Sequence, residues 1–270
     1  MFEDIINNVQ ISIPFDLLKE KYLSLVLKNR VNPEISLDGG VIDTYSRKDF
    51  SEIASILQQE GLSITLHGPF YDLVPGGMDK KILRTTRERL RQVFDLIPVF
   101  KPMSIVCHTG YDKNRYHEVE KEWLETAIET WTPLVDDIQG TGTILVIENV
   151  FEKTPEMLFR LMKGLDSTTV GFCFDIGHMY VFSETSIEVW LKSLGPFLKQ
   201  LHLHDNDGTW DDHWAIGAGK IDFEILFRFL EENRLRPVIT LEPHQEEWIW
   251  QSLEALSESA RFSRIIKLEG

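Results

Sequence analysis

The sequence of 270 residues has few cysteines and no long apolar run. The two cysteines, Cys107 and Cys173, lie within short apolar stretches, where a free thiol usually packs as a small hydrophobic side chain, so we expect no structural disulfide. No stretch approaches the roughly 18 to 20 apolar residues that a membrane-spanning helix requires. These absences argue against a disulfide-rich scaffold and against a membrane protein.

Basic residues are also scarce. The 43 acidic residues outnumber the 28 basic ones, which gives a formal net charge of −15. A surface of this charge repels polyanions on average, and no basic, aromatic-rich stripe is found, so we expect no nucleic-acid partner. The start MFEDIINNVQ lacks the basic and apolar regions of a signal peptide, and we expect a cytoplasmic protein. The sequence leaves the oligomeric state open, a homo-oligomer included.

Short apolar or β-branched runs alternate with longer amphipathic segments along the whole chain, as is typical of a parallel sheet built from strand-helix units. Strands are predicted at residues 9–13, 33–37, 63–67, 104–108, 144–149, 171–175, 200–204 and 238–242. Helices are predicted at residues 16–30, 47–60, 79–97, 117–138, 155–164, 186–198, 223–233 and 246–265. Thr154 and Asp222 are predicted N-caps of the two helices that follow them.

Eight such units in a chain of this length close most naturally into a barrel, since a (β/α)8 barrel typically needs about 250 residues. An open, doubly wound sheet is the competing topology, but no glycine-rich dinucleotide fingerprint follows the first strand. We therefore predict an α/β protein, with one (β/α)8 TIM barrel domain over residues 1–270.

Histidine or carboxylate side chains end six successive predicted strands, at intervals of 41, 40, 27, 27 and 40 residues. They are His67, His108, Glu148, Asp175, His202 and Glu242. Because the C-terminal ends of parallel strands meet at one face of a barrel, these six side chains should converge there. A single histidine at a strand end is usually a structural residue, but chance does not place such residues at six strands in a row. The pattern predicts a metal site.

Further candidates extend this set. His178 lies three residues after Asp175, and Asp211 and His213 fall in the loop after the seventh strand. His204 projects to the same side of its strand as His202, so either could be a ligand. Ligands of the His, Asp and Glu types without cysteine suit a divalent ion, and we expect zinc or manganese, in one to three ions.

Aromatic residues flank these ligands. Phe70, Tyr71, Trp210 and Trp214 could form a pocket wall that stacks on a sugar ring, or could simply seal the top of the barrel. Lys220 could reach a substrate phosphate, although an exposed lysine without such a role is the alternative. His117 lies on a charged helix and is predicted to be a surface residue.

The chain resembles the xylose isomerase-like TIM barrels from about residue 60 to residue 243. This group includes sugar-phosphate isomerases and epimerases as well as the endonuclease IV branch, AP endonuclease family 2. The resemblance is carried by FDIGH at 174–178, by HLHDNDGTWDDHWAIGAGKIDF at 202–223 and by LEPH at 241–244. Each motif alone is weak, whereas their combination and order are specific.

The two branches imply different ligand sets. The endonuclease IV branch implies a trinuclear zinc cluster held by His67, His108, Glu148, Asp175, His178, His202, Asp211, His213 and Glu242. The isomerase branch implies one ion, held by Glu148, Asp175, His202 or His204, and Glu242. The first strand, QISIPF, lacks the histidine-bearing start of the endonuclease branch, and SLDGGVIDT is too short and acidic for its DNA-penetrating loop.

Three functions follow from the resemblance. We expect a metal-dependent isomerase or epimerase of a small sugar or sugar phosphate, in which Glu148 and Glu242 transfer the proton and His178 and His204 bind substrate. The alternative is an endonuclease IV-like phosphoester hydrolase with a multinuclear zinc site. A third reading is a non-catalytic barrel that binds a metal or a sugar.

Overall fold

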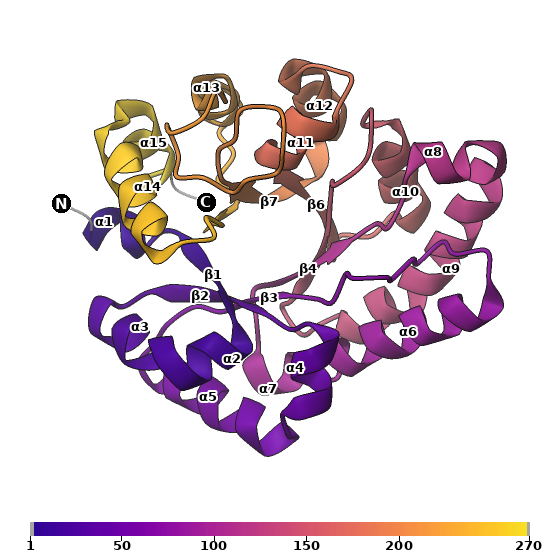
Figure 1. Cartoon of the computed structure of the whole chain (residues 1–270), viewed down its shortest axis with the longest axis horizontal. Coiled ribbons are helices and arrows are strands. Elements are labelled where there is room, and N and C mark those ends of the chain that lie inside the picture. Colours follow the sequence, from indigo (N-terminus) through magenta and orange to yellow (C-terminus); the bar gives the residue numbers. More distant parts are fainter. Residues whose placement is uncertain (1–2, 269–270) are drawn as a thin grey trace.

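The computed structural model describes residues 3–268 and shows a closed barrel of eight parallel strands, ordered β1 to β8 around the ring. A layer of helices surrounds it (Figure 1). The predicted fold is confirmed. Within the described residues, no helix has both the length and the apolar character needed to cross a bilayer. Met1 and Phe2, in the segment inspected for a signal peptide, lie outside the described range.

All eight strands lie within two residues of their predicted bounds. They are β1 (Gln10–Pro14), β2 (Asn32–Ser36), β3 (Thr65–His67), β4 (Ser104–His108), β5 (Ile144–Glu148), β6 (Val170–Asp175), β7 (Leu198–Leu203) and β8 (Val238–Leu241).

The helices that cover the barrel follow the predicted segments, with several additional short ones. In the first half of the chain they are α1 (Glu3–Ile6), α2 (Phe15–Leu17), α3 (Leu23–Asn29), α4 (Gly39–Thr44), α5 (Arg47–Gln59), α6 (Lys80–Phe94), α7 (Ile97–Phe100) and α8 (Lys113–Tyr116). In the second half they are α9 (Glu120–Ile138), α10 (Glu156–Leu165), α11 (Ile176–Phe182), α12 (Ile187–Leu194), α13 (Phe223–Asn233), α14 (Glu246–Glu258) and α15 (Ala260–Ile265).

Two predicted helices are interrupted. The segment 16–30 divides into α2, a π-helical turn at Leu18–Tyr22 and α3. The C-terminal segment breaks at Ser259, whose side chain accepts a hydrogen bond from the backbone N–H of Phe262 and so caps α15. A π-turn widens the helix by one residue, which hydrophobic periodicity alone does not predict.

Of the two predicted N-cap residues, Asp222 is confirmed and Thr154 is not. Asp222 caps α13 by accepting a hydrogen bond from the N–H of Glu224, as predicted. The predicted cap at Thr154 is wrong: α10 begins one residue later, at Glu156, with Pro155 at the N-cap and no side-chain cap. Pro155 already has helical dihedral angles, so the chain enters the helix without a capping hydroxyl.

The main apolar core lies between the outer face of the strands and the helices, and includes Phe15, Trp131, Trp190 and Phe262. Inside the barrel, a small cluster of Val106, Val146 and Cys173 contributes a second apolar layer. Both cysteines are buried and free, as expected. The burial of these faces fixes which side chains of each strand point into the barrel.

The interior also contains a buried polar layer below the mouth of the barrel. Glu34 of β2 is fully buried, and its Oε2 accepts hydrogen bonds from Thr65, Gln200 and Thr240 on three other strands. Burying a carboxylate is costly unless it is paired and hydrogen-bonded, so these contacts hold Glu34 in place. Its other oxygen, Oε1, lies 3.0 Å from Nε2 of His202.

Candidate metal centre

The six predicted strand-end residues meet at the mouth of the barrel, which is its C-terminal end. His67, His108, Glu148 and Asp175 are the last residues of β3 to β6, His202 is the penultimate residue of β7, and Glu242 directly follows β8. The strand register places His108 beside Glu148, and Asp175 beside His202. We call these six side chains the inner group.

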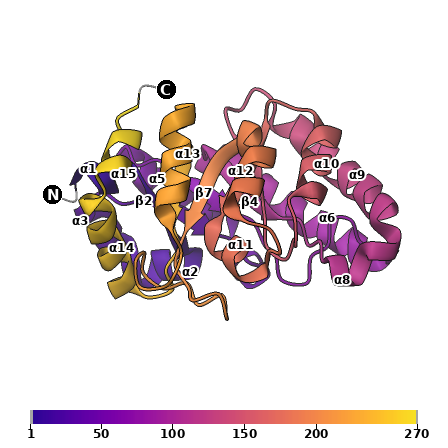
Figure 2. The ribbon, with the colours of Figure 1, turned by 90° about the horizontal axis from the view of Figure 1, so that it is seen from above.

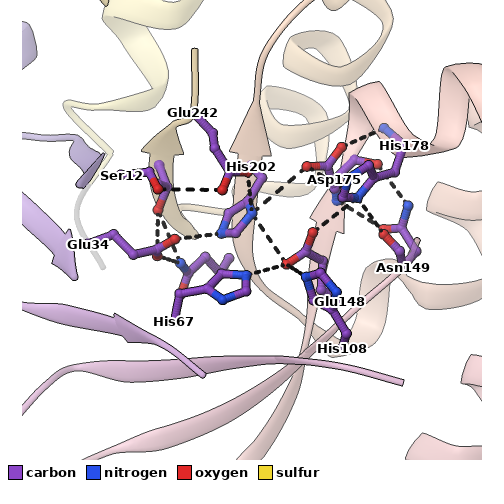
Figure 3. Close-up of polar contacts among 12 residues, drawn as sticks. Ser12, Glu34, His67, His108, Glu148, Asn149, Asp175, His178, His202 and Glu242 are labelled. Carbon is purple, nitrogen blue, oxygen red and sulfur yellow. Dashed lines mark hydrogen bonds and ion pairs between the residues drawn. The ribbon is translucent and has the colours of Figure 1, made fainter. Parts of the chain in front are cut away.

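Glu148 occupies the middle of the inner group (Figure 3). Its carboxylate is 1% exposed and lies 3.3 Å from Nε2 of His67, 3.4 Å from Nε2 of His108 and 3.4 Å from Nδ1 of His202. Its other oxygen lies 3.1 Å from Nδ1 of His178. One buried carboxylate thus faces four imidazole rings.

His202 faces the other carboxylates of the inner group. Its Nδ1 lies 3.0 Å from Glu242 Oε2, 3.4 Å from Glu148 Oε2 and 3.9 Å from Asp175 Oδ2. Although the ring is fully buried, neither of its nitrogens makes a hydrogen bond of good geometry. An imidazole nitrogen surrounded by three carboxylate oxygens without a proper hydrogen bond is the arrangement expected of a metal ligand.

Three more residues form what we call the outer group: His178, Asp211 and His213. Asp211 Oδ2 lies 3.1 Å from Nε2 of His178 and 3.2 Å from Nε2 of His213. The structure brings this group together from α11 and from the long connection 204–222, which projects from the mouth between β7 and α13 (Figures 1 and 2).

His204 lies between the inner and the outer group and does not replace His202. Its Nε2 lies 3.1 Å from each oxygen of Asp175 and 3.8 Å from Oδ1 of Asp211, and its ring stacks on His213 at 3.6 Å between centroids. His202 instead faces Glu148 and Glu242. The two histidines therefore occupy different positions, although sequence alone could not separate them.

Backbone carbonyl groups set the orientation of three rings. The Nδ1 atoms of His67, His178 and His213 lie 2.9, 3.0 and 2.8 Å from the carbonyl oxygens of Gly68, Asn149 and Glu242. Because a carbonyl oxygen can only accept, each Nδ1 must carry the proton. Each Nε2 faces a carboxylate, and in the neutral ring it has the free lone pair with which histidines bind metal.

Asp205 organises the connection 204–222. Its carboxylate accepts hydrogen bonds from the backbone N–H groups of four residues: Asn206, Gly217, Gly219 and Ile221. Glycine is required at 219 because a Cβ there would collide with Asp205 and the backbone of Asn206. Gly177 of the FDIGH motif is required for a similar reason, since its Cβ would collide with the ring of His204.

The charges of the site are balanced between carboxylates and imidazoles. Burial opposes the charged form of His213, but its bond with Asp211 and the charges of Glu242, Asp211 and Asp175 outweigh burial and raise its pKa to about 9. For Glu242, burial is outweighed by the nearby charges of His202 and His213, which hold its pKa well below the usual range. Protons on imidazoles thus neutralise ionised carboxylates, a role that metal cations can take over when they displace those protons.

The chemistry of these side chains fits divalent metal ions. Several overlapping sets offer three or more ligand atoms within 4.8 Å of one another, including His67–His108–Glu148, Glu148–Asp175–His178 and His178–His204–Asp211–His213. Nitrogen and carboxylate ligands without a thiolate suit zinc and manganese. Cys173 also lies near Glu148 and His202, but burial raises the pKa of its thiol well above the usual value, which disfavours the thiolate that would bind metal.

The predicted substrate-binding residues differ in how close they lie to the candidate metal centre. Phe70 stacks on His108 at 4.5 Å and lies at the mouth. Trp210 is 73% exposed, and Trp214 is half-buried and pairs through its backbone with Asp205. Lys220 is exposed and its Nζ lies 3.8 Å from Asp207 Oδ2. The structure therefore groups Phe70 with the inner group, and neither Trp210 nor Lys220 makes a polar or ring contact with a predicted ligand.

Sequence reasoning missed several residues that support the site. Asn149 joins the ends of β5 and β6 by two hydrogen bonds to the backbone of Asp175, and Ser12 donates to Glu242 at 3.5 Å. His244 stacks on His213 at 3.9 Å. The one available signal for Glu34 was a charged residue within a predicted apolar strand.

Comparison with known protein families agrees with the barrel fold. Residues 34–266 match the family model described as "Xylose isomerase-like TIM barrel". Protein MJ1311 of Methanocaldococcus jannaschii is 28% identical over 79% of this chain and 75% of its own length. A probable endonuclease 4 of Mycobacterium leprae is 24% identical over 64% of this chain and 70% of its own length.

Solved structures of similar fold cover nearly the whole chain. A D-tagatose 3-epimerase-like protein superposes with a TM-score of 0.79 and 26% identity, covering 96% of this chain and 98% of its own. The TTHB071 protein of Thermus thermophilus, from a crystal soaked with ZnCl2, has a TM-score of 0.78 and 26% identity, covering 93% of this chain and 98% of its own.

Proposed function

Since the chain belongs to the xylose isomerase-like TIM barrel family, we propose that it is a divalent-metal enzyme whose multinuclear centre hydrolyses a phosphate ester of a small molecule. The observation that carries the proposal is the position of Glu148, whose buried carboxylate faces four imidazoles. A single-ion isomerase needs only the quartet Glu148, Asp175, His202 and Glu242. A bridging carboxylate between ligand sets is instead typical of centres that hold more than one ion.

The inner and outer groups would provide three ligand sets, of which the first two share Glu148. These are His67, His108 and Glu148; Glu148, Asp175, His202 and Glu242; and His178, Asp211 and His213. When bound there, divalent ions polarise a phosphoryl oxygen and lower the pKa of water. Glu34 would hold His202 from behind, since its Oε1 lies 3.0 Å from Nε2 of that ring.

Glu242 is the carboxylate best placed to take a proton. Its side chain is 16% exposed and lines a cavity at the mouth, whereas Glu148 is enclosed by histidines. The lowered pKa keeps Glu242 ionised at neutral pH. Its position at the cavity lets it accept the proton that water loses as its oxygen bonds to phosphorus. The ester oxygen then departs with the electrons of its bond. Ser12 holds the second oxygen of Glu242 in place.

A small substrate fits this mouth better than duplex DNA. The net charge of −15 disfavours a polyanion, and the cavity beside Glu242 has a volume of about 390 Å³, within the range of small-molecule sites. Phe70 covers His108 at this mouth and would limit the access of bulk water.

Isomerisation or epimerisation of a sugar is the second candidate, supported by the likeness to a D-tagatose 3-epimerase-like protein. In that reaction Glu148 and Glu242 would exchange a proton with a substrate carbon on opposite sides. The quartet that such chemistry needs is present. Glu148, however, is 1% exposed and surrounded by imidazoles, which favours a role as ligand over a role as base.

Metal stoichiometry and three substrates separate the candidates. The protein is loaded with zinc or manganese, its metal content is measured by mass spectrometry, and it is assayed with bis(p-nitrophenyl) phosphate, D-tagatose and abasic-site duplex DNA. We expect two or three ions per chain and cleavage of the phosphate ester. One ion with epimerisation of the sugar would overturn the proposal in favour of the second candidate, and strand cleavage of the duplex would assign the protein to DNA repair.

A further inference from the structure

The ladder between β1 and β8 closes the barrel but is short, and it ends before the level of the metal centre. β1 pairs with β2 at five positions, from Gln10 to Pro14, but with β8 at only two, Gln10 with Thr240 and Ile11 with Leu241. Beyond Ile11 the two strands make no ladder, and the residues that follow on each side line the cavity of about 390 Å³. The cavity therefore lies in the seam between the first and the last strand.

One part of this seam cavity belongs to the metal centre. Ser12 and Glu242 line it and contact each other, and Glu242 lies 3.0 Å from His202. Phe70, which stacks on His108, lines it too. A molecule in the cavity can therefore place a polar group beside Glu242.

The remaining wall is mainly apolar, although Asp38 and Glu246 also line it. Its apolar part includes Leu17, Tyr22 and Leu25 from the N-terminal segments and Ile249 and Trp250 from α14. These helices lie on either side of β1 (Figure 1), and Tyr22 is the last residue of the π-helical turn between α2 and α3. Leu17 is 41% exposed, so its side chain is accessible from the cavity.

The charges around the cavity are all negative. Its lining includes Asp38, Glu242 and Glu246 but no lysine or arginine among the described residues. A second phosphate or carboxylate at the far end would meet no cation and would be repelled. The far end is therefore suited to an uncharged group.

From this juxtaposition, we propose that the substrate carries an uncharged alkyl or aryl group that fills the seam cavity, while its polar head meets the metal centre. The placement of the head rests on the proposed function, whereas the apolar site stands on the cavity itself. The proposal excludes a sugar phosphate with an anionic group at its far end. It predicts a small amphiphilic substrate with one polar and one apolar end.

Alkylphosphonates test the complete assignment because they are not hydrolysed. Methyl-, butyl- and hexylphosphonate are titrated by calorimetry into zinc-loaded protein, and the dissociation constant should tighten about fourfold per buried methylene until the cavity is full. Equal affinities along the series would overturn the assignment. Binding of the neutral probe N-phenyl-1-naphthylamine, followed by fluorescence without metal, tests the apolar site even if the hydrolase proposal fails.

Variants place the site. Ile249→Trp and, independently, Leu25→Trp fill the cavity and should reduce the hexyl-to-methyl affinity ratio to within about twofold of unity, since no room for methylenes is left. Val189→Trp, at a 45% exposed position on α12, is the matched control and should keep the wild-type ratio. Methylphosphonate binding by each variant reports that its metal centre is folded.

Two results would refute the apolar site. An unchanged ratio and unchanged probe binding in both filled variants would place the apolar group elsewhere. A filled variant that changes only the oligomeric state, seen by size-exclusion chromatography, would assign this face to contact between copies of the chain.

Discussion

The inner and outer groups hold the same types of side chain but are built differently. Five of the six inner residues lie on the strands, and their carboxylates and imidazoles are at most 16% exposed. In the outer group, Asp211 is 26% exposed and is carried, with His213, by the connection 204–222. Strand ends are fixed by the barrel ladder, whereas the loop depends on the four hydrogen bonds to Asp205. We therefore expect the inner group to bind ions more tightly than the outer group.

The largest effect should come from Glu148→Gln, which removes the charge that the four imidazoles share. Loss of the bridging carboxylate should lower turnover of bis(p-nitrophenyl) phosphate by at least about a thousandfold and reduce the bound metal by more than one equivalent. Steady-state kinetics and metal analysis check this. Glu254→Gln, at an exposed position of α14, is the control. Full metal content in Glu148→Gln would remove the basis for a bridging role.

Asp211→Asn tests the outer group alone. The substitution keeps the size of the side chain but removes the charge between His178 and His213, so one equivalent of metal should be lost while the inner ions stay bound. Turnover should fall by about a hundredfold, as is typical when one ligand or its support is removed. If all ions leave together, the two groups form one cooperative unit and the comparison fails.

Glu34→Gln tests the support behind the inner group. The amide cannot replace the carboxylate that faces Nε2 of His202, so affinity for the inner ion should fall by about 10-fold to 100-fold. Affinity for the outer ion should stay within about twofold of wild type, because Glu34 contacts no outer residue. Competition with a chelating dye measures both constants. Equal losses at both groups would show a general defect in folding.

The last prediction concerns the pH dependence of stability and leaves the metal centre unchanged. Burial raises the pKa of Glu152 to about 7, even though Thr109 and the N–H of Val150 donate hydrogen bonds to it. A carboxyl with a raised folded-state pKa stabilises the fold below its unfolded pKa of about 4.3, and this stability is lost as the pH rises toward about 7.

Glu152→Gln removes that titration while keeping the shape of the protonated acid. Relative to wild type, the variant should therefore gain stability between pH 4.5 and pH 7, by at most about 3 kcal/mol. Urea unfolding of the two proteins at pH 5 and pH 8 measures the difference. Parallel pH profiles would show that Glu152 is ionised throughout.

The strand ends were predictable because each is a local feature. A polar residue after a short apolar strand can be read from the sequence, and barrel closure brings those positions together. The supporting residues were not predictable in this way. Glu34 matters only because β2 turns it into the barrel toward His202 of β7, and His244 matters through its stacking on His213. Such pairings depend on three-dimensional register.

The loop residues show the same limit. Trp210 directly precedes Asp211 and Lys220 follows His213 in the same connection, yet Trp210 is 73% exposed and Lys220 contacts Asp207. The path of the connection 204–222 is set by its hydrogen bonds to Asp205, not by any periodic pattern. The cavity between β1 and β8 likewise joins residues from the two ends of the chain.

The carbonyl oxygens that orient His67, His178 and His213 belong to the main chain, so no side-chain substitution at those acceptor positions can delete them. The orientation of these three predicted ligands is therefore fixed by the path of the backbone. Residues that line the seam cavity, such as Leu25 and Ile249, can be substituted without altering the orientation of these rings. Residues that would contact the substrate can therefore change during evolution while the geometry of the predicted metal site is retained.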